Sequence, residues 1–182
     1  QNTPKNRARL CPEDAPGASA IQISGSDPRL MADLAQAQVA SGARAIDINM
    51  GCPVKKVCRK NAGSALLRDE ALVTKILATV VAAVNVPVTL KTRLGWDANQ
   101  INIVAISHIA AATGIAALAI HGRTREQSYS GPVDYDMIAT VKRSVSIPVW
   151  ANGDIRAPEI ARQVLLQTGA DGVMIGRGTC GQ

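Results

Sequence analysis

The sequence predicts an α/β fold in which short parallel strands alternate with helices, and two repeated patterns support this. Three segments, 42–48, 114–120 and 169–175, each begin with a glycine that can end a helix and continue into small and apolar residues. Two segments that alternate with them, 85–88 and 146–149, read Asn-Val-Pro-Val and Ser-Ile-Pro-Val. Strands that are separated by one helix each have to pair in parallel through right-handed crossovers.

Taken in order, the chain reads as six strand–helix units after a lead-in loop at residues 1–20, which are polar and rich in proline and charge. Short bounded apolar runs predict strands at residues 21–25, 43–50, 86–92, 115–121, 147–151 and 172–176. Apolar residues at helical spacing predict helices at 64–67, 70–84, 99–113, 135–144 and 158–167. A further helix opens at Asp27-Pro28, where a capping residue precedes a proline, and it ends before Gly42.

Six such units fit either a doubly wound sheet or most of a (β/α)8 TIM barrel. Every predicted strand ends in polar or glycine-rich residues, which favours the barrel. No Gly-x-Gly-x-x-Gly motif follows the first strand, as a dinucleotide-binding half would require. A complete barrel needs about 250 residues. We therefore expect residues 21–182 to form one incomplete TIM barrel that lacks the first two strands.

Composition limits the possible classes of function. Of the 182 residues 47% are apolar, enough for one domain with a core, and no run of 18 apolar residues predicts a membrane span. The net charge of +6 suits a polyanionic partner. With 2% aromatic residues and no Phe, an aromatic stacking surface for single-stranded RNA is not expected. The four cysteines lack zinc-site spacing, so we expect no metal and a cytoplasmic protein with reduced thiols.

Polar residues and glycines follow the end of every predicted strand. In a barrel of parallel strands the carboxyl ends meet on one rim, so these residues should converge. They are Gln22 and Ser24; Asn49 and Cys52; Lys91 and Arg93; His121, Arg123, Thr124 and Arg125; Asn152, Gly153 and Asp154; and Gly176 and Arg177. We interpret this ring as the candidate site.

The ring has a definite chemical character. Lys91 lies within an apolar strand, where a lysine needs an anion or a polarised ring beside it. The segment Gly176-Arg-Gly178 offers backbone N–H groups and a guanidinium to a phosphate. The segment Asn152-Gly-Asp154 could bind the hydroxyls of a ribityl or ribose chain. Together these features suggest flavin mononucleotide (FMN), and a sugar phosphate would also fit.

The same residues carry a family resemblance. The matching segments are 21–28 (IQISGSDP), 47–53 (DINMGCP) with Lys55-Lys-Val57, 62–67 (AGSALL), 86–91 (VPVTLK), 120–125 (IHGRTR), 151–155 (ANGDI), and 169–171 (GAD) with Met174-Ile-Gly-Arg177. In this order they resemble the tRNA-dihydrouridine synthase family, most of all its bacterial B-type subfamily. The resemblance covers about residues 16–179.

The resemblance implies an FMN enzyme that reduces the C5–C6 bond of uridines in tRNA to dihydrouridine, with NADPH as electron donor. It implies that Cys52 donates a proton to C5 while hydride reaches C6. Free thiols are mostly protonated at neutral pH, which suits a proton donor. The positions implied for the flavin are Gln22, Asn49, Lys91, His121, Asn152, Gly153, Asp154, Gly176 and Arg177. Lys55, Lys56, Arg123 and Arg125 are candidates for the substrate uridine or tRNA phosphates.

Two alternatives remain open on the sequence. One is an FMN barrel that acts on a free pyrimidine, like a dihydroorotate dehydrogenase. The other is a non-catalytic barrel that binds RNA or a sugar phosphate. The tandem Lys55-Lys56 and the pair Arg123 and Arg125 favour a polyanion over a free pyrimidine.

The chain also departs from the family pattern. We expect two initial strands and a C-terminal helical tRNA-binding domain to be absent from it. Unpaired strand edges would then leave the isolated 182 residues poorly stable, whereas the full-length protein is expected to be monomeric. Cys58 stands where B-type members carry Asn, which places a second thiol six residues from Cys52.

Overall fold

The computed structural model describes residues 20–179, and their six strands form one parallel sheet. The strands are β1 (Ala20–Ile23), β2 (Ala45–Met50), β3 (Val88–Arg93), β4 (Ala117–His121), β5 (Val149–Asn152) and β6 (Gly172–Met174). They pair strictly in the order of the chain, β1-β2-β3-β4-β5-β6. A doubly wound sheet reverses its strand order at a switch point, whereas a barrel wall does not. The order therefore confirms a partial TIM barrel.

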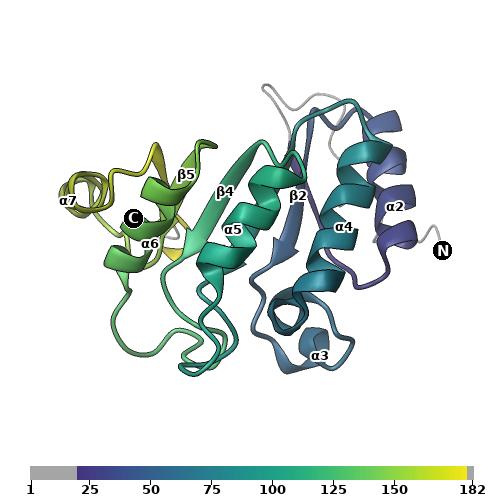
Figure 1. Cartoon of the computed structure of the whole chain (residues 1–182). Coiled ribbons are helices and arrows are strands. Elements are labelled where there is room, and N and C mark those ends of the chain that lie inside the picture. Colours follow the sequence, from purple (N-terminus) through teal and green to yellow (C-terminus); the bar gives the residue numbers. More distant parts are fainter. Residues whose placement is uncertain (1–19, 180–182) are drawn as a thin grey trace.

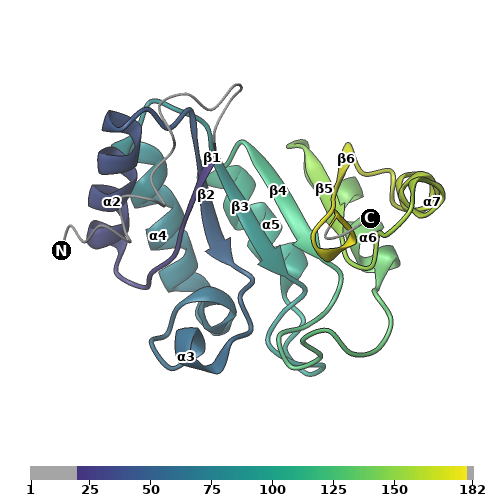
Figure 2. The same cartoon turned by 180° about the vertical axis from the view of Figure 1, so that it is seen from behind.

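All the long helices lie on one face of the curved sheet (Figure 1). They are α2 (Pro28–Ala40), α4 (Glu70–Ala83), α5 (Ile103–Ala112), α6 (Tyr135–Ser144) and α7 (Pro158–Thr168). Seen from behind, the sheet lies in front of α4 and α5, and its other face is not covered by helices (Figure 2). One covered and one open face is the arrangement of a barrel wall seen from outside and from the lumen.

The alternation of residues along β2 shows how the sequence creates these two faces. Ile46, Ile48 and Met50 are fully buried and belong to the core beneath the helices. Asp47 and Asn49 lie between them and point to the open face, because successive residues of a strand point to opposite sides. Thr89 pairs in register with Asp47, and Lys91 with Asn49, so the polar side of the sheet continues into β3.

Three helices begin with an aspartate that satisfies their first free N–H groups. Asp27 accepts a hydrogen bond from Leu30 N at 2.9 Å, and Asp69 and Asp134 cap α4 and α6 in the same way. The predicted cap at Asp27-Pro28 is confirmed. Each cap follows a loop on the side of the sheet where the strands end, so the caps fix where these loops stop.

The structure differs from the predicted elements at two places in the loops. The helix predicted at 99–113 begins at Ile103, because Gly95 and Ile101 form an isolated β-bridge and Trp96 N donates to the carbonyl of Gln100. A short helix, α3 (Lys55–Cys58), was not predicted, and the 3₁₀ helix η1 (Gly63–Arg68) covers the segment predicted as helical at 64–67. The lead-in loop predicted at 1–20 lies outside the described residues except for Ala20, which begins β1. Within residues 20–179, none of the helices has the length and apolar character that crossing a bilayer requires.

Candidate active site

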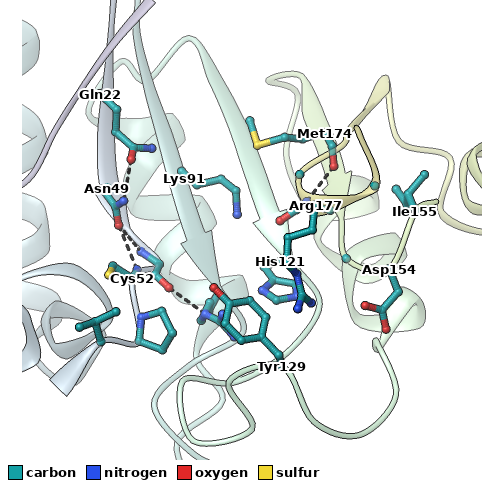
Figure 3. A pocket seen from close by; sticks show the side chains of 18 of the residues that line it. Gln22, Asn49, Cys52, Lys91, His121, Tyr129, Asp154, Ile155, Met174 and Arg177 are labelled. Atoms are coloured by element: carbon teal, nitrogen blue, oxygen red, sulfur yellow. Dashed lines mark hydrogen bonds between the residues drawn. The ribbon is translucent and has the colours of Figure 1, made fainter. Parts of the chain in front are cut away.

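A cavity of about 360 Å³ opens at the carboxyl end of the sheet, where the strands continue into their loops (Figure 3). This volume lies in the range of small-molecule pockets, about 300–1,000 Å³. The structure brings together ten of the residues expected in the site, at least one from each of the six strands or the loop after it. They are Gln22, Asn49, Cys52, Lys91, His121, Asn152, Gly153, Asp154, Gly176 and Arg177.

A hydrogen-bonded network crosses the open face at the β1–β3 side of the cavity. Gln22 Nε2 donates to Asp47 Oδ2 at 2.6 Å, and Asn49 Nδ2 donates to Gln22 Oε1 at 2.7 Å. Thr89 Oγ1 donates to Asp47 Oδ1 at 2.7 Å. Since each amide has its donor and acceptor side assigned by a partner, the network fixes how Gln22 and Asn49 are oriented.

The backbone around Cys52 is held from both sides. Asn49 Oδ1 accepts the N–H groups of Gly51 and Cys52, each at 3.0 Å. Ser64 Oγ donates to the Cys52 carbonyl at 2.8 Å, and Arg93 Nε donates to the Gly51 carbonyl at 2.7 Å. These four bonds place the half-buried Cys52 at the cavity wall with little freedom for its backbone.

Two neighbours pack closely beneath Cys52. A Cβ added at Gly63, where φ is +61°, would lie 2.9 Å from the Cys52 carbonyl oxygen and 3.1 Å from its Cβ. Cys58 is buried, with Sγ 3.7 Å from the same carbonyl oxygen, and both Cys52 and Cys58 are free thiols. The turn at Gly63 therefore requires a residue without a side chain.

Lys91 reaches into the cavity from the middle of the wall (Figure 3). Burial, and secondarily the Arg93 charge, lower the pKa of Lys91 from 10.5 to about 8, although Asp47 acts in the opposite direction. No hydrogen bond or ion pair of its ammonium group occurs among residues 20–179. A desolvated and unpaired cation at this point favours a ligand with acceptor atoms or negative charge.

His121 lies on the same face as Arg93, with which it pairs in register, and its exposed fraction is 7%. Burial lowers the pKa of His121 from 6.5 to about 3, and the charges of Arg93, Lys91 and Arg123 act in the same direction. His121 is therefore neutral at physiological pH. Its Nε2 lies 3.5 Å from Arg123 Nη1, which can only donate, so Nε2 is the acceptor in this contact.

The buried Arg123 and the exposed Asp154 form an ion pair on the far side of the cavity. Arg123 is 3% exposed, pairs with Asp154, and donates from Nε and Nη2 to the Gly131 carbonyl. The hydrogen bond from Arg123 lowers the pKa of Asp154. Tyr135 Oη donates to the Gly153 carbonyl at 2.5 Å, which holds the left-handed turn at Asp154 (φ +49°).

Arg123 was expected to contact the substrate uridine or a tRNA phosphate, and this stays a prediction. Among the described residues its guanidinium donates to Gly131, Asp154 and His121, which holds the loop between β4 and α6 in place. The other three residues expected to meet tRNA lie outside the cavity. Lys55 and Lys56 are exposed on α3, and Arg125 stacks on Trp96.

The family is decided by comparison with known sequences. The family model described as "Dihydrouridine synthase (Dus)" matches residues 1–182, the whole chain. The chain belongs to the dihydrouridine synthase family. Curated Dus relatives include "tRNA-dihydrouridine synthase B" from Pseudomonas syringae, 56% identical over 100% of this chain, and from Vibrio cholerae, 57% identical over 96%. Both matches cover 54% of the relative, so the chain spans about half the length of these curated Dus proteins.

Solved structures support the same fold for this Dus chain. Mandelate oxidase with 3,3-difluoro-2-hydroxy-3-phenylpropionic acid aligns with a TM-score of 0.64 at 20% identity, covering 90% of this chain and 50% of that one. N-succinyl Arg/Lys racemase from Bacillus cereus aligns at 0.58 and 16% identity, covering 86% and 36%. The six-stranded wall of this chain thus aligns with only part of each of these longer chains.

Several residues that line the cavity of this Dus chain had no role assigned from the sequence, among them Arg93, Tyr129 and Met174. Arg93 was placed on the rim without a role, although it lies two residues after Lys91 and so on the same face. Tyr129 comes from the long loop after β4, with the Arg177 guanidinium 4.3 Å from its ring centre. Met174, the last residue of β6, accepts a hydrogen bond from Asn152 Nδ2 through its carbonyl. Nothing in the sequence pattern distinguishes Tyr129 from an ordinary loop residue.

The donors of the cavity fit the FMN that the family implies. Lys91 and the amides of Gln22 and Asn49 offer polar groups to an acceptor-rich ring, and the Lys91 ammonium has no partner within residues 20–179. At the opposite end a side chain added at Gly176 would meet no atom within 4 Å, which leaves its backbone accessible beside Arg177. Within the described part of the chain, no group of three His, Cys, Asp or Glu residues could hold a metal ion.

Proposed function

We propose that the protein carrying this chain is an FMN-dependent tRNA-dihydrouridine synthase that reduces the C5–C6 bond of uridine in tRNA with NADPH. Family membership and the printed names of the curated relatives support the reaction. The observation that carries the proposal is the Cys52 backbone, held by Asn49 and Ser64 at the wall of a cavity that Lys91 enters.

The residues that would hold FMN fall into two groups. Gln22, Asn49 and Lys91 would bind the polar edge of the ring at the β1–β3 side. Asn152 and Asp154 would meet the hydroxyl chain, while Gly176 and Arg177 would bind the phosphate. When bound, the reduced flavin supplies the hydride that is added at C6 of the uracil.

Cys52 completes the reduction by giving the proton of its thiol to C5. Hydride at C6 and proton at C5 together add two electrons and two hydrogens across the double bond, which yields 5,6-dihydrouridine. The resulting thiolate takes a proton from solvent before the next turnover. The bonds to the N–H and carbonyl of Cys52 restrict where its thiol can lie, so the proton is held near one face of the bound base.

The substrate base has to leave the RNA stack to reach this cavity, because a stacked base would not bring C5 to a thiol in a cavity wall. Lys55, Lys56 and Arg125 are positioned outside the cavity, where they would neutralise phosphates of the flanking strand. The same charges argue against a free pyrimidine as the physiological substrate.

The test is an assay of the full-length protein. We expect it to bind flavin, seen as visible absorbance, and to oxidise NADPH with unmodified tRNA but not with free uridine or orotate. Cys52→Ala should abolish dihydrouridine formation and keep the flavin, whereas the buried neighbour Cys58→Ala should keep both. Normal turnover by Cys52→Ala would reject Cys52 as the proton donor. A colourless protein that binds tRNA would indicate a plain RNA-binding barrel.

A further inference from the structure

We propose that Arg68, Trp96 and Arg125, which we call the Arg–Trp–Arg stack, form a docking platform for a nucleotide of the RNA outside the catalytic cavity. The guanidinium carbons of Arg68 and Arg125 each lie 4.4 Å from the centre of the Trp96 ring. The three residues come from η1, from the loop after β3 and from the loop after β4. None of them lines the cavity that holds Cys52.

Backbone hydrogen bonds tie together the two loops that carry Trp96 and Arg125. Arg125 N donates to the Gly95 carbonyl at 2.9 Å, and Glu126 N donates to the Trp96 carbonyl at 3.0 Å. Trp96 N in turn donates to the Gln100 carbonyl at 3.1 Å. A side chain at Gly95 would collide with that same carbonyl, at 2.0 Å, so this turn needs glycine. The backbone that carries Trp96 is therefore held in place, and its indole lies between η1 and the loop after β4, which contribute an arginine each.

The two arginines of the stack differ in exposure. Arg125 is half-buried, and its Nε is buried without a hydrogen-bond partner within residues 20–179. Arg68 is exposed, and neither arginine belongs to the two ion pairs of the described residues, Arg123–Asp154 and Lys142–Asp171. Arg68 thus carries an unneutralised, planar cation that its contact with Trp96 restrains.

Nearby carboxylates are engaged elsewhere. Asp69 Oδ1 accepts the Leu72 N–H at the start of α4, and Glu70 Oε1 accepts a hydrogen bond from Asn102 Nδ2. Asp97 Oδ1 accepts the Asn99 N–H. None of these carboxylates forms an ion pair with Arg68 among residues 20–179, so its guanidinium N–H groups stay available to a phosphate.

The stack adjoins the most basic segment of the described chain. Between Asp47 and Asp69 the sequence has five basic residues and no acidic one: Lys55, Lys56, Arg59, Lys60 and Arg68. Asn61, in the turn that follows α3, and Arg68 line one further cavity of about 290 Å³, which places the stack next to this segment. A strand of RNA that follows these charges would reach Arg68.

A nucleic acid fits this platform better than an acidic peptide, because a guanidinium plane can stack on a base as well as bind a phosphate. The low aromatic content argued against a surface of aromatic rings that stack on RNA bases. Here the planar guanidinium groups of two arginines, packed on one tryptophan, take the place of such rings. The identity of the RNA as tRNA rests on the proposed function. The experiment that tests the platform measures tRNA binding and does not depend on uridine reduction.

The experiment compares variants of the full-length protein in equilibrium binding to an unmodified tRNA transcript, at several salt concentrations. Arg68→Gln should weaken binding about five- to tenfold and lower the salt slope by about one phosphate contact. Arg68→Lys, which keeps the charge but not the plane, should weaken binding about threefold without changing the salt slope. Arg44→Gln is the matched control, since Arg44 is exposed just before β2, at the opposite end of the sheet.

The outcomes separate the possibilities. If Arg68→Gln binds tRNA as Arg44→Gln does, the platform does not exist. If Arg68→Lys equals the wild type while Arg68→Gln is weakened, the contact is charge alone and the stacking proposal fails. Equal weakening by both variants toward poly-glutamate, with tRNA unaffected, would assign the surface to an acidic protein. A wild type that binds tRNA but does not reduce it would reject the proposed function and leave this test intact.

Discussion

At the scale of single residues, the site depends on backbone positions that tolerate little change. Gly63 is the strongest case, because a side chain there would press on the Cys52 carbonyl from 2.9 Å in a left-handed conformation. Asn49 is another, since one side-chain oxygen accepts two backbone N–H groups of the Cys52 loop. Both residues act on the thiol through the backbone that carries it.

We expect Gly63→Ala to reduce dihydrouridine formation by the full-length protein at least tenfold and to lower its stability by about 1–3 kcal/mol. The added methyl has to displace the backbone of Cys52. Gly169→Ala is the matched control: φ is +64°, but no atom lies within 4 Å of the added Cβ. Gly169→Ala should lower the free energy of unfolding by about 1 kcal/mol and leave dihydrouridine formation unchanged. Turnover assays and thermal melts measure both effects, and equal activity of the two variants would contradict the role of Gly63.

Lys91 gives a pH dependence with a definite sign. The pKa of Lys91 is about 8 in the folded protein, against its ordinary value of 10.5, which we take for the unfolded chain. Between these two pH values the unfolded chain binds a proton that the folded chain does not. The contribution of Lys91 to stability therefore rises as pH increases from about 8 to 10.5. Below about pH 8 the buried charge of Lys91 lowers the free energy of unfolding by on the order of 3 kcal/mol.

We expect Lys91→Met to raise the melting temperature of the flavin-free protein at pH 7 and to flatten its change between pH 8 and 10. The exposed Lys75 on α4 supplies the control, Lys75→Met, which should do neither. Melts across this pH range measure the difference between the two variants. A lower melting temperature of Lys91→Met at pH 7 would show that Lys91 is paired in the folded state.

At the scale of elements, the loops after the strands are shaped by caps and by contacts between loops. We expect Asp69→Ala to destabilise the protein by about 1 kcal/mol, because α4 loses the oxygen that accepts the Leu72 N–H. Asp69→Asn keeps an acceptor at the cap and should be close to wild type. Denaturant unfolding distinguishes the two, and equal losses would mean that charge, not the cap, is the stabilising feature.

The elements also show what the sequence could and could not reveal. Periodicity located every strand and long helix, because each buries one face in the core. It predicted α5 as a helix but started it at residue 99, four residues too early. The bridge between Gly95 and Ile101 that delays the helix is a contact between loop residues, which periodicity does not report. The rim residues were predictable because they follow strand ends. The burial of Arg123 was not, because it depends on Gly131 and Asp154, 8 and 31 residues away.

At the scale of the whole molecule, the sheet of the described residues ends in two open edges. β1 pairs only with β2 and β6 only with β5, and Trp150 is 37% exposed on the face opposite the helices. Unpaired edges and exposed apolar side chains favour association between chains.

We therefore expect the 182-residue chain, expressed by itself, to melt without a sharp transition and to elute as aggregates from gel filtration. A full-length protein from the same source provides the comparison, under identical buffer and concentration. A cooperative melt of the short chain with one equivalent of FMN retained after gel filtration would show that these six units suffice for folding.

The strictly sequential strand order also determines how a bound ligand couples the stability of the six strand–helix units to one another. Each of the six units contributes at least one residue to one cavity, so the cavity is complete only when all six are docked at the same time. A ligand that binds only the complete cavity needs all six units in place, so the opening of any single unit is enough to release it. By linkage, its binding energy stabilises the least stable unit as strongly as the most stable one. The half-life of the bound ligand would then report on the weakest unit of the wall, however far that unit lies from Cys52.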